Sequence, residues 1–268
     1  MAAPKTAAPF EVICEIEPAT TPDLKRVRHQ IGVLSQIATS FLIPDNHIGR
    51  ATVSSVAVAH EVEAMGGRSI ACLNARDRNL LGFRRDLLTA AAYGVDQFLF
   101  VYGDEPAAGA RTSELKVRAM IEEGRAYADT LAPGSGRGAG DGAGTMRFGA
   151  ATGLRPLPAW KRAADFLFVQ IGFSLEALLA WRARVDVAVP VYAGVIVVAS
   201  PKMAKSLEIP GLTVPEDLVE RLERDRNAGV DAACDLVTAI RDSGAFDGVH
   251  LIPVARYREV AARLERLL

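Results

Sequence analysis

The sequence predicts an α/β fold, a single (β/α)8 TIM barrel, and three observations support this. Eight strand-like runs recur along the 268 residues, with helix-like segments between them. These runs are almost continuously apolar, as strands buried on both faces of a parallel sheet are, and do not alternate like half-exposed antiparallel strands. Eight such units also match the usual length of this barrel, about 250 residues. A doubly wound open sheet is the alternative fold.

The predicted strands follow one another at regular intervals. The first, from Phe10 to Glu17, is rich in β-branched residues and is closed by Pro18, and a helix is expected at about residues 23–37. The other strand-like runs occupy residues 40–45, 68–74, 97–104, 146–152, 165–172, 189–198 and 248–254.

Helical signals are clear in the last part of the chain. Pro215, Glu216 and Asp217 form a predicted first turn, followed by apolar residues at helical spacing. A C-terminal helix is predicted from an apolar stripe made of Tyr257, Val260, Ala261, Leu264 and Leu268. Residues 132–145, which read APGSGRGAGDGAGT, have no periodicity and are expected to form a loop between the fourth helix and the fifth strand.

Composition and charge exclude several classes of function. Lys and Arg number 31 and Asp and Glu 32, for a net charge of −1, so the basic surface that nucleic-acid binding needs is missing. No apolar run reaches the roughly 20 residues that would span a bilayer. Residues 1–9 lack the apolar segment of a secretory signal and are expected to be a flexible leader to one catalytic domain at residues 10–268. Three widely spaced cysteines favour a reducing, cytoplasmic location.

The first strand carries two candidate acids, Glu15 and Glu17. Their spacing puts both on one face of the strand, and the inward face of a barrel strand is largely dry. Burial would favour the neutral carboxyl group, which is the form a general acid needs. The alternative is that these side chains cap a helix or pair with an arginine; Glu15 is the preferred candidate for catalysis.

Polar residues also stand where the fourth and sixth strands end, which is the catalytic end of a barrel. Tyr102, Gly103 and Asp104 close the fourth strand; the glycine lets a ligand approach the backbone while the acid fixes it, unless Asp104 only caps a helix. Gln170, in the middle of FVQIGF, needs partners for its amide, either in a heterocyclic ligand or in the protein. Gly194 inside a bulky strand suggests close approach of a flat group.

The remaining candidates are charged or titratable. Asn74 and Arg76, within NARDRN, could hold a carboxylate or phosphate tail or could belong to an ion-pair network. His47 follows the second strand, and His250 lies in the last strand, where a structural role competes with a ligand role. No set of His and carboxylate residues has the spacing of a metal site.

Five segments together resemble the methylenetetrahydrofolate reductase family. They include the third strand ending in RDRN, the fourth ending in GD and Pro, the sixth holding the Gln, the seventh with PV, Gly and a following Lys, and a late GVH. The segments are residues 73–106, 165–174, 189–205, 209–222 and 248–256. The resemblance implies a (β/α)8 barrel that reduces 5,10-methylenetetrahydrofolate to 5-methyltetrahydrofolate with NADH or NADPH.

The resemblance also assigns roles to residues. Glu15 resembles the glutamate that acts as general acid when the folate ring opens, and Asp104 resembles the aspartate next to the pterin. Gln170 resembles the glutamine that binds the folate, and Asn74, Tyr102 and Gly194 are expected beside the same substrate. The positions that match the family's cofactor site are Thr152, His47 and Arg76.

Four departures from the family concern its FAD site. Residues 44–51, PDNHIGRA, replace a glycine-rich loop; residues 72–75, CLNA, replace a His-Leu-Thr-Cys segment; Tyr102 replaces an arginine; and the loop after the fifth strand is short, at residues 152–158. The loss of glycines and of a basic partner leaves little to hold the FAD pyrophosphate. The chain is therefore similar to a flavin-free branch, in which the nicotinamide delivers hydride directly to the folate.

Two other functions stay open at this point. One is an FAD-dependent reductase with an altered flavin site, and the other is a folate-binding homologue that has lost hydride transfer. The expected partners are a folate and a nicotinamide nucleotide; the sequence is compatible with a monomer and leaves the oligomeric state and the choice between NADH and NADPH open.

Overall fold

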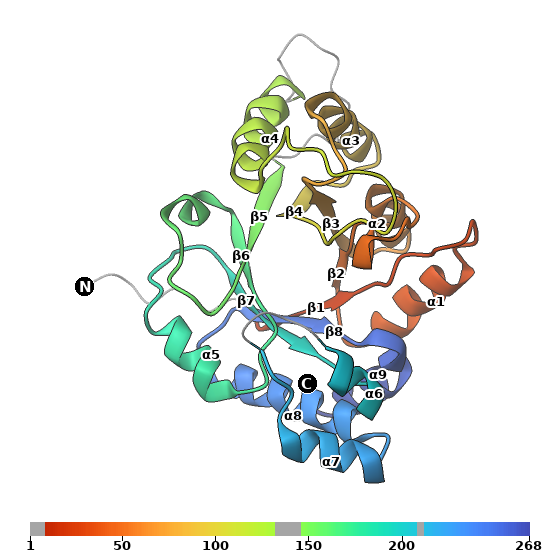
Figure 1. The fold of residues 1–268 in the computed structure, drawn as a ribbon, viewed down its shortest axis with the longest axis vertical. Coiled ribbons are helices and arrows are strands. Elements are labelled where there is room, and N and C mark those ends of the chain that lie inside the picture. The colour runs from red at the N-terminus through yellow and green to blue at the C-terminus, as the bar shows by residue number, and fades with distance from the viewer. Residues whose placement is uncertain (1–8, 132–145, 208–211) are drawn as a thin grey trace.

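A computed structural model describes residues 9–131, 146–207 and 212–268, and it confirms the predicted barrel. Eight parallel strands close in sequence order, and β8 pairs with β1 (Figure 1). The strands are β1 (Glu11–Glu15), β2 (Ser40–Ile43), β3 (Arg68–Asn74), β4 (Gln97–Val101), β5 (Arg147–Thr152), β6 (Phe166–Val169), β7 (Val191–Ile196) and β8 (Gly248–Ile252).

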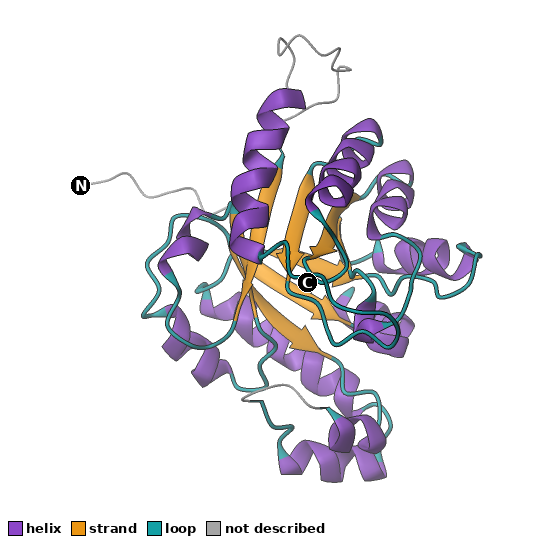
Figure 2. Ribbon diagram, turned by 45° about the horizontal axis from the view of Figure 1, so that its top comes forward, coloured by secondary structure: helices purple, strands orange, loops and turns teal. Residues whose placement is uncertain are grey.

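Helices surround this barrel on the outside (Figure 2). The α-helices are α1 (Lys25–Leu34), α2 (Ser55–Ala64), α3 (Leu80–Ala92), α4 (Val117–Leu131), α5 (Leu175–Arg182), α6 (Pro201–Ser206), α7 (Glu216–Arg224), α8 (Ala228–Ser243) and α9 (Tyr257–Leu264). Short 3-10 turns are η1 (His47–Gly49), η2 (Ala159–Ala163) and η3 (Val254–Arg256).

Two connections differ from the regular pattern of one helix after each strand: the one between β5 and β6 and the one between β7 and β8. Only the turn η2 joins β5 to β6, because Gly153, Pro156 and Pro158 interrupt any helix there. By contrast, β7 is followed by α6, α7 and α8, and α7 begins after Pro215 as predicted. In α9 the predicted stripe is buried except for Leu268, which lies beyond the helix and is 49% exposed. The expected leader, apart from residue 9, and the expected loop at 132–145 lie outside the described residues.

Two apolar clusters show which face of each strand points inward. The larger one lies between the strands and the helices and includes Phe41, Phe98 and Trp181. The smaller one fills the barrel interior with residues from alternate strand positions: Ile13, Leu42, Ile70, Cys72, Leu99, Phe166, Phe168 and Tyr192. Glu15 follows Ile13 by two positions, so it continues the inward face of β1 toward the carboxyl end of the barrel.

The amino end of the barrel interior is closed by polar contacts around Glu11. Ser40 Oγ donates to Glu11 Oε1 at 2.5 Å, Arg68 Nη2 donates to the same oxygen at 2.8 Å, and Tyr192 Oη donates to Oε2 at 2.8 Å. Burial and this carboxylate raise the pKa of Tyr192 well above its ordinary value. These hydrogen bonds close the amino end of the barrel interior, so the barrel opens at its carboxyl end.

None of the described helices has both the length and the apolar character needed to cross a bilayer.

Candidate functional site

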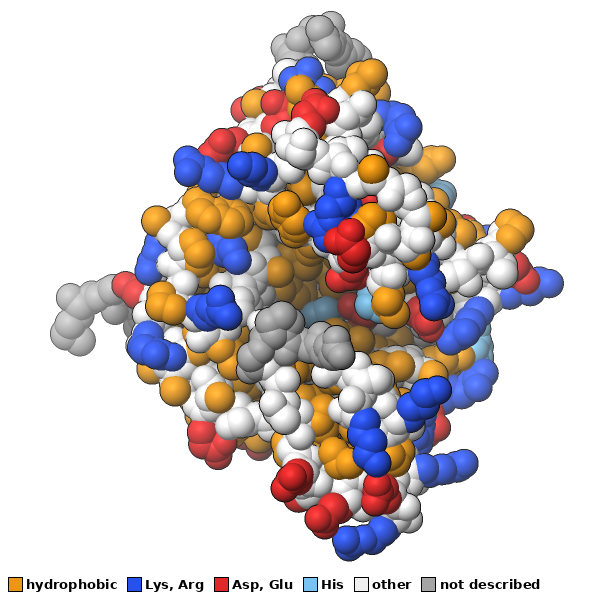
Figure 3. All heavy atoms as spheres, in the orientation of Figure 1, with side chains coloured by type: hydrophobic (Ala, Val, Ile, Leu, Met, Phe, Trp, Pro, Cys, Tyr) orange, Lys and Arg blue, Asp and Glu red, His pale blue; other side chains and the backbone are white. Residues whose placement is uncertain are grey.

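A pocket of about 450 Å³ opens at the carboxyl end of the barrel. Figure 3 shows this face hollowed at its centre, with hydrophobic side chains on the walls. The walls include Leu42, Cys72, Leu99, Phe168 and Ile252, and the polar groups at the rim come from several strand ends. Burial raises the pKa of the Cys72 thiol well above its ordinary value, so this wall residue is a neutral thiol. An apolar pocket with a few polar groups suits a flat organic ligand.

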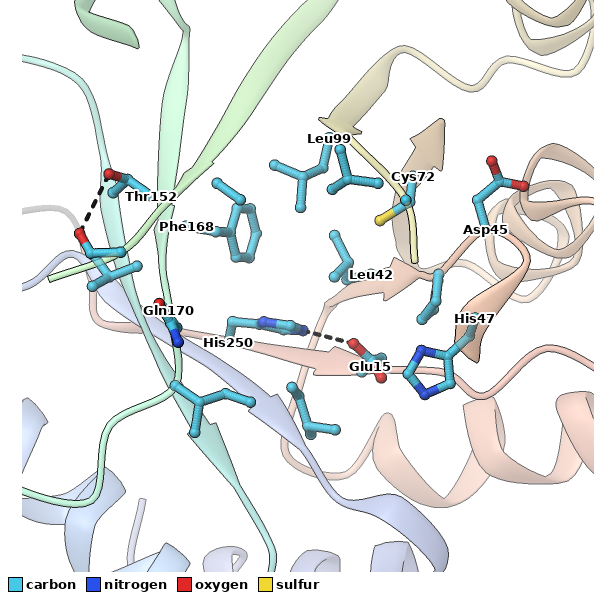
Figure 4. Close-up of a pocket in the computed structure, with 18 of the residues that line it drawn as sticks. Glu15, Leu42, Asp45, His47, Cys72, Leu99, Thr152, Phe168, Gln170 and His250 are labelled. Atoms are coloured by element: carbon cyan, nitrogen blue, oxygen red, sulfur yellow. Dashed lines mark hydrogen bonds and ion pairs between the residues drawn. The ribbon is translucent and has the colours of Figure 1, made fainter. Parts of the chain in front are cut away.

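Glu15 and His250 form an acidic and basic pair inside this pocket (Figure 4). Glu15 Oε2 lies 3.3 Å from His250 Nε2, and the two side chains are only 15% and 11% exposed. This contact is an ion-pair approach and no hydrogen bond, and His250 Nε2 is buried without a hydrogen-bond partner. Phe168 packs against the imidazole with its ring at 86° and centroids 5.1 Å apart, which fixes the ring.

Glu17, the second candidate acid, lies outside the pocket lining. Its side chain is 54% exposed and pairs with Arg26 at 2.9 Å. This is the ion-pair alternative considered for it above.

Asp104 and His47 reach the pocket on two loops that are packed against each other. The backbone N–H of Ile48 donates to Asp104 Oδ2 at 3.0 Å, and the N–H of Ala107 donates to the carbonyl of Gly49 at 2.9 Å. Gly49 has a φ of +68°, and a Cβ there would lie 1.9 Å from the carbonyl oxygen of Glu105. Only glycine fits this approach, so the loops that follow β2 and β4 hold each other in place.

The opposite wall carries Thr152, Lys161 and Gln170. Thr152 is buried at the end of β5 and accepts, through its backbone oxygen, a hydrogen bond of 2.7 Å from the N–H of Gln170. The side chain of Gln170 is half-buried just after β6 and borders the pocket. Lys161 Nζ donates to the carbonyl of Ala151 at 2.6 Å, and burial lowers the pKa of this lysine.

Arg76 and Asn74 do not line the pocket, because their polar groups are used within the protein. Arg76 is 3% exposed; its Nε and Nη2 donate to Asp77 at 2.5 and 2.6 Å, and Nη1 donates to the backbone oxygen of Asp104. Asn74 donates to Asp45 at 2.6 Å and to Asp77 at 3.0 Å. The hydrogen bonds from Arg76 hold the pKa of Asp77 well below its usual range. Of the two readings of NARDRN, the internal network accounts for these contacts.

Tyr102 and Gly194 also lie outside the pocket lining. Tyr102 is 61% exposed. The guanidinium carbon of Arg111 lies over the Tyr102 ring, 5.5 Å from the centroid of that ring. Gly194 does mark a close approach, but the approaching group is the neighbouring strand. A Cβ on Gly194 would lie 2.6 Å from the backbone oxygen of Val169. Tight strand packing therefore explains this glycine without a ligand.

Sequence reasoning missed Lys161 and left His250 undecided. Lys161 stands in the turn η2, where no strand or helix pattern indicates its direction. His250 could have been placed by parity, because Gly248, His250 and Ile252 alternate along β8 and Ile252 also borders the pocket. Among the described residues, no group of three or more His, Cys, Asp or Glu side chains could hold a metal ion.

Comparisons with known proteins identify the fold. No family model matches the chain, and no curated protein matches it. An uncharacterized protein from Clostridium thermocellum that binds two copies of 5-methyl-5,6,7,8-tetrahydrofolic acid is 13% identical, with a TM-score of 0.64 over 98% of this chain and 97% of that one.

Two further solved structures are similar. EDTA monooxygenase from Chelativorans sp. BNC1 is 10% identical, with a TM-score of 0.55 over 97% of this chain and 94% of that one. DHPS from Yersinia pestis, in a structure with a pterine-sulfa conjugate, is 11% identical, with a TM-score of 0.51 over 96% of this chain and 93% of that one. At these identities the likeness shows a shared barrel fold.

Proposed function

We propose that this protein reduces 5,10-methylenetetrahydrofolate to 5-methyltetrahydrofolate with NADH or NADPH. The observation that carries the proposal is that Glu15, Asp104 and Gln170 border one pocket although they come from β1, the loop after β4 and the end of β6. These are the residues that resemble the acid, the aspartate and the folate-binding glutamine of the reductase family. Their meeting at the carboxyl end of the barrel agrees with the usual place of catalysis in this fold.

Each of the three side chains has a separate role in the proposed reaction. Glu15 protonates the nitrogen that leaves when the imidazolidine ring of the substrate opens, and the product of that step is an iminium cation. Asp104 stabilises the cation, and the amide of Gln170 orients the pterin. Hydride transfer from the nicotinamide then completes the reduction. The acid step contributes about 10² to 10⁴ in rate, and orientation of the two rings contributes further.

Two of the similar structures support a folate or pterin ligand. The Clostridium thermocellum protein binds 5-methyltetrahydrofolic acid, which is the product of the proposed reaction. The Yersinia pestis enzyme was solved with a pterine-containing compound. The apolar walls of the present pocket, with an amide and carboxylates at the rim, suit the same ring system.

We propose that hydride passes directly from nicotinamide to folate, because the residues present fit FAD poorly. A flavin dinucleotide that stays bound through both half-reactions needs several cations or free backbone N–H groups to hold its pyrophosphate, whereas a nicotinamide dinucleotide binds and leaves in each turnover and needs fewer such contacts. Lys161 is the one lysine or arginine among the described residues that line the pocket. The loop after β2 is packed on the loop after β4, and Arg76 is bonded within the protein, so neither offers a phosphate cradle.

The test is turnover by the purified protein. NADH oxidation should depend on added 5,10-methylenetetrahydrofolate, and mass spectrometry should show one 5-methyltetrahydrofolate for each NADH consumed. Repeating the assay with NADPH gives the preferred nucleotide. Absence of the methylated product at high protein concentration would reject the reductase proposal.

A folate-binding protein without hydride transfer is the second candidate. It is favoured by the Clostridium thermocellum protein, which binds two copies of 5-methyl-5,6,7,8-tetrahydrofolic acid. Calorimetry with 5-methyltetrahydrofolate separates the two candidates: both predict binding, whereas only the reductase predicts NADH oxidation.

A further inference from the structure

His250 carries a buried nitrogen with no hydrogen-bond partner, and this nitrogen faces the pocket. The residue is 9% exposed, and its Nε2 is one of the few buried side-chain atoms without a hydrogen bond among the described residues. A buried polar atom left unpaired destabilises the fold, so such an atom in a pocket points to use during ligand binding or chemistry.

The fold holds His250 against Glu15. β8 pairs with β1 in parallel, with His250 opposite Ile13, and Glu15 is the next inward residue along β1. The edge-to-face contact with Phe168 limits rotation of the imidazole. Figure 4 shows the ring of His250 directed at the carboxylate of Glu15, where Nε2 and Oε2 are 3.3 Å apart.

The proposed reaction gives this pair a task. Reduction of the methylene group consumes one hydride from the nucleotide and one proton, and the proton comes from Glu15. Glu15 is left as a carboxylate after each turnover, so a second group must protonate it before the next. This step rests on the proposed function.

We propose that His250 acts through Glu15, by returning this proton to the Glu15 carboxylate after each turnover. The imidazolium Nε2–H gives its proton to Oε2 of the carboxylate, the N–H bond breaks and the O–H bond forms. The neutral imidazole then takes a proton from a hydronium ion or a buffer acid in the solvent. Over one turnover a single proton moves from solvent through His250 and Glu15 to the folate nitrogen, which matches the proton that the reduction consumes.

Other titratable groups near the pair are less suited to this role. Asp45 accepts hydrogen bonds from Asn74 and pairs with Arg78, and Lys161 is bonded to the carbonyl of Ala151. Tyr192, the next ring along the barrel interior, is bonded to Glu11 at the closed amino end. His47 also borders the pocket, but it is exposed and lies on a loop, so it serves as the comparison residue in the test.

The experiment compares steady-state turnover of the wild-type protein with His250→Gln, His250→Ala and His47→Gln. Glutamine keeps a polar amide near the position of Nε2 but has no proton to transfer. We expect His250→Gln to lower kcat at least tenfold, roughly, while the KM for folate stays within about threefold. Added imidazole should restore a large part of the turnover of His250→Ala and leave His250→Gln unchanged. His60→Gln, an exposed change on α2, should behave as wild type.

The outcomes separate this inference from the proposed function. An active wild-type protein together with an unchanged kcat in His250→Gln overturns the role of His250 and leaves the reductase standing. A higher KM or a lower melting temperature of the His250 variants, with no rescue of His250→Ala by imidazole, would identify a structural histidine. That result would also overturn the proton-transfer role of His250. A larger loss of kcat in His47→Gln than in His250→Gln would assign the proton to His47. A wild-type protein without turnover rejects both proposals.

Discussion

Two glutamates that are two positions apart in the sequence have opposite surroundings. Glu15 lies inside the barrel with 15% of its side chain exposed, beside His250 and below the mouth of the pocket. Glu17 is 54% exposed and pairs with Arg26. The same side chain is therefore available for chemistry at one position and solvated at the other, and this difference permits a matched test.

We expect Glu15→Gln to lower kcat by about 10² to 10⁴ with folate affinity changed by less than about fivefold, because the amide keeps the shape but cannot donate the proton. Stopped-flow turnover and calorimetry measure the two quantities. Glu17→Gln, the same change two residues away, should keep kcat within about twofold. Full turnover of Glu15→Gln with normal binding would remove the acid role.

Five of the candidate residues border the pocket, and their positions follow from strand ends. Glu15, Asp104, Gln170, His47 and Thr152 all border it, because parallel strands of a barrel end at one mouth. Asn74 and Arg76 also stand near strand ends, yet their side chains bond to aspartates of neighbouring segments. Which partner a polar side chain takes depends on contacts between distant loops, and periodicity carries no information about those contacts.

At the scale of elements, the loops after β2, β3 and β4 are connected by the network around Arg76. This side chain, 1% exposed, contacts Asp77 on its own loop, the backbone oxygen of Asn46 at 3.5 Å, and the backbone oxygen of Asp104. The network fixes the loops that present His47 and Asp104 to the pocket. Residues 76–79, RDRN, therefore hold the loops around the pocket in place without lining the pocket.

We expect Asp77→Asn to lower the free energy of unfolding by about 3 kcal/mol, because it leaves the buried guanidinium of Arg76 without its charged partner. Urea unfolding measures the change. Glu122→Gln, which removes the exposed pair of Arg118 and Glu122, should change it by less than about 0.5 kcal/mol. Equal effects of the two substitutions would contradict a structural role for the network.

The same pair predicts a pH dependence. Because the pKa of Asp77 is lowered in the folded protein, its contribution to stability is fully present at neutral pH and is lost as the pH falls below about 4, the ordinary range of an aspartate. The difference in unfolding free energy between wild type and Asp77→Asn should therefore shrink from pH 7 toward acid. A difference that stays constant or grows would argue against the ion pair as its source.

Gly194 of β7 lies where this strand packs closely against β6. Gly194→Ala places a Cβ against the backbone of β6, which cannot move without breaking the barrel, so we expect a loss of about 1 to 3 kcal/mol in thermal or urea unfolding. Gly32→Ala on α1 is the control: its Cβ would meet only Met65 at 3.9 Å, and helix propensity predicts a gain of about 0.5 to 1 kcal/mol. Unchanged stability of Gly194→Ala would reopen the question of a ligand at this glycine.

At the scale of the whole molecule, the order of strands and helices was predictable, and the connections were less so. Near-continuous apolar runs predict buried parallel strands, and eight of them close into one barrel. The turn η2 in place of a helix, and the three helices after β7, depend on local prolines and on insertions that the barrel tolerates outside its strands. The pocket itself lies where the fold class predicts.

The pocket as a whole also predicts how the protein looks in solution. With Lys161 as the single lysine or arginine among its described lining residues, we expect protein purified without added cofactor to be colourless, with no flavin absorption at roughly 450 nm. Flavin that copurifies in a ratio of one per chain would contradict the direct-transfer proposal and favour the FAD-dependent alternative.

The most direct test of direct hydride transfer uses NADH carrying deuterium at both C4 positions. Transfer from nicotinamide to folate predicts one deuterium atom in the methyl group of each 5-methyltetrahydrofolate formed in ordinary water, as read by mass spectrometry. A flavin intermediate would exchange its hydrogen with water before passing it on. A methyl group without deuterium would therefore contradict direct transfer, and absence of the methylated product would contradict the reductase itself.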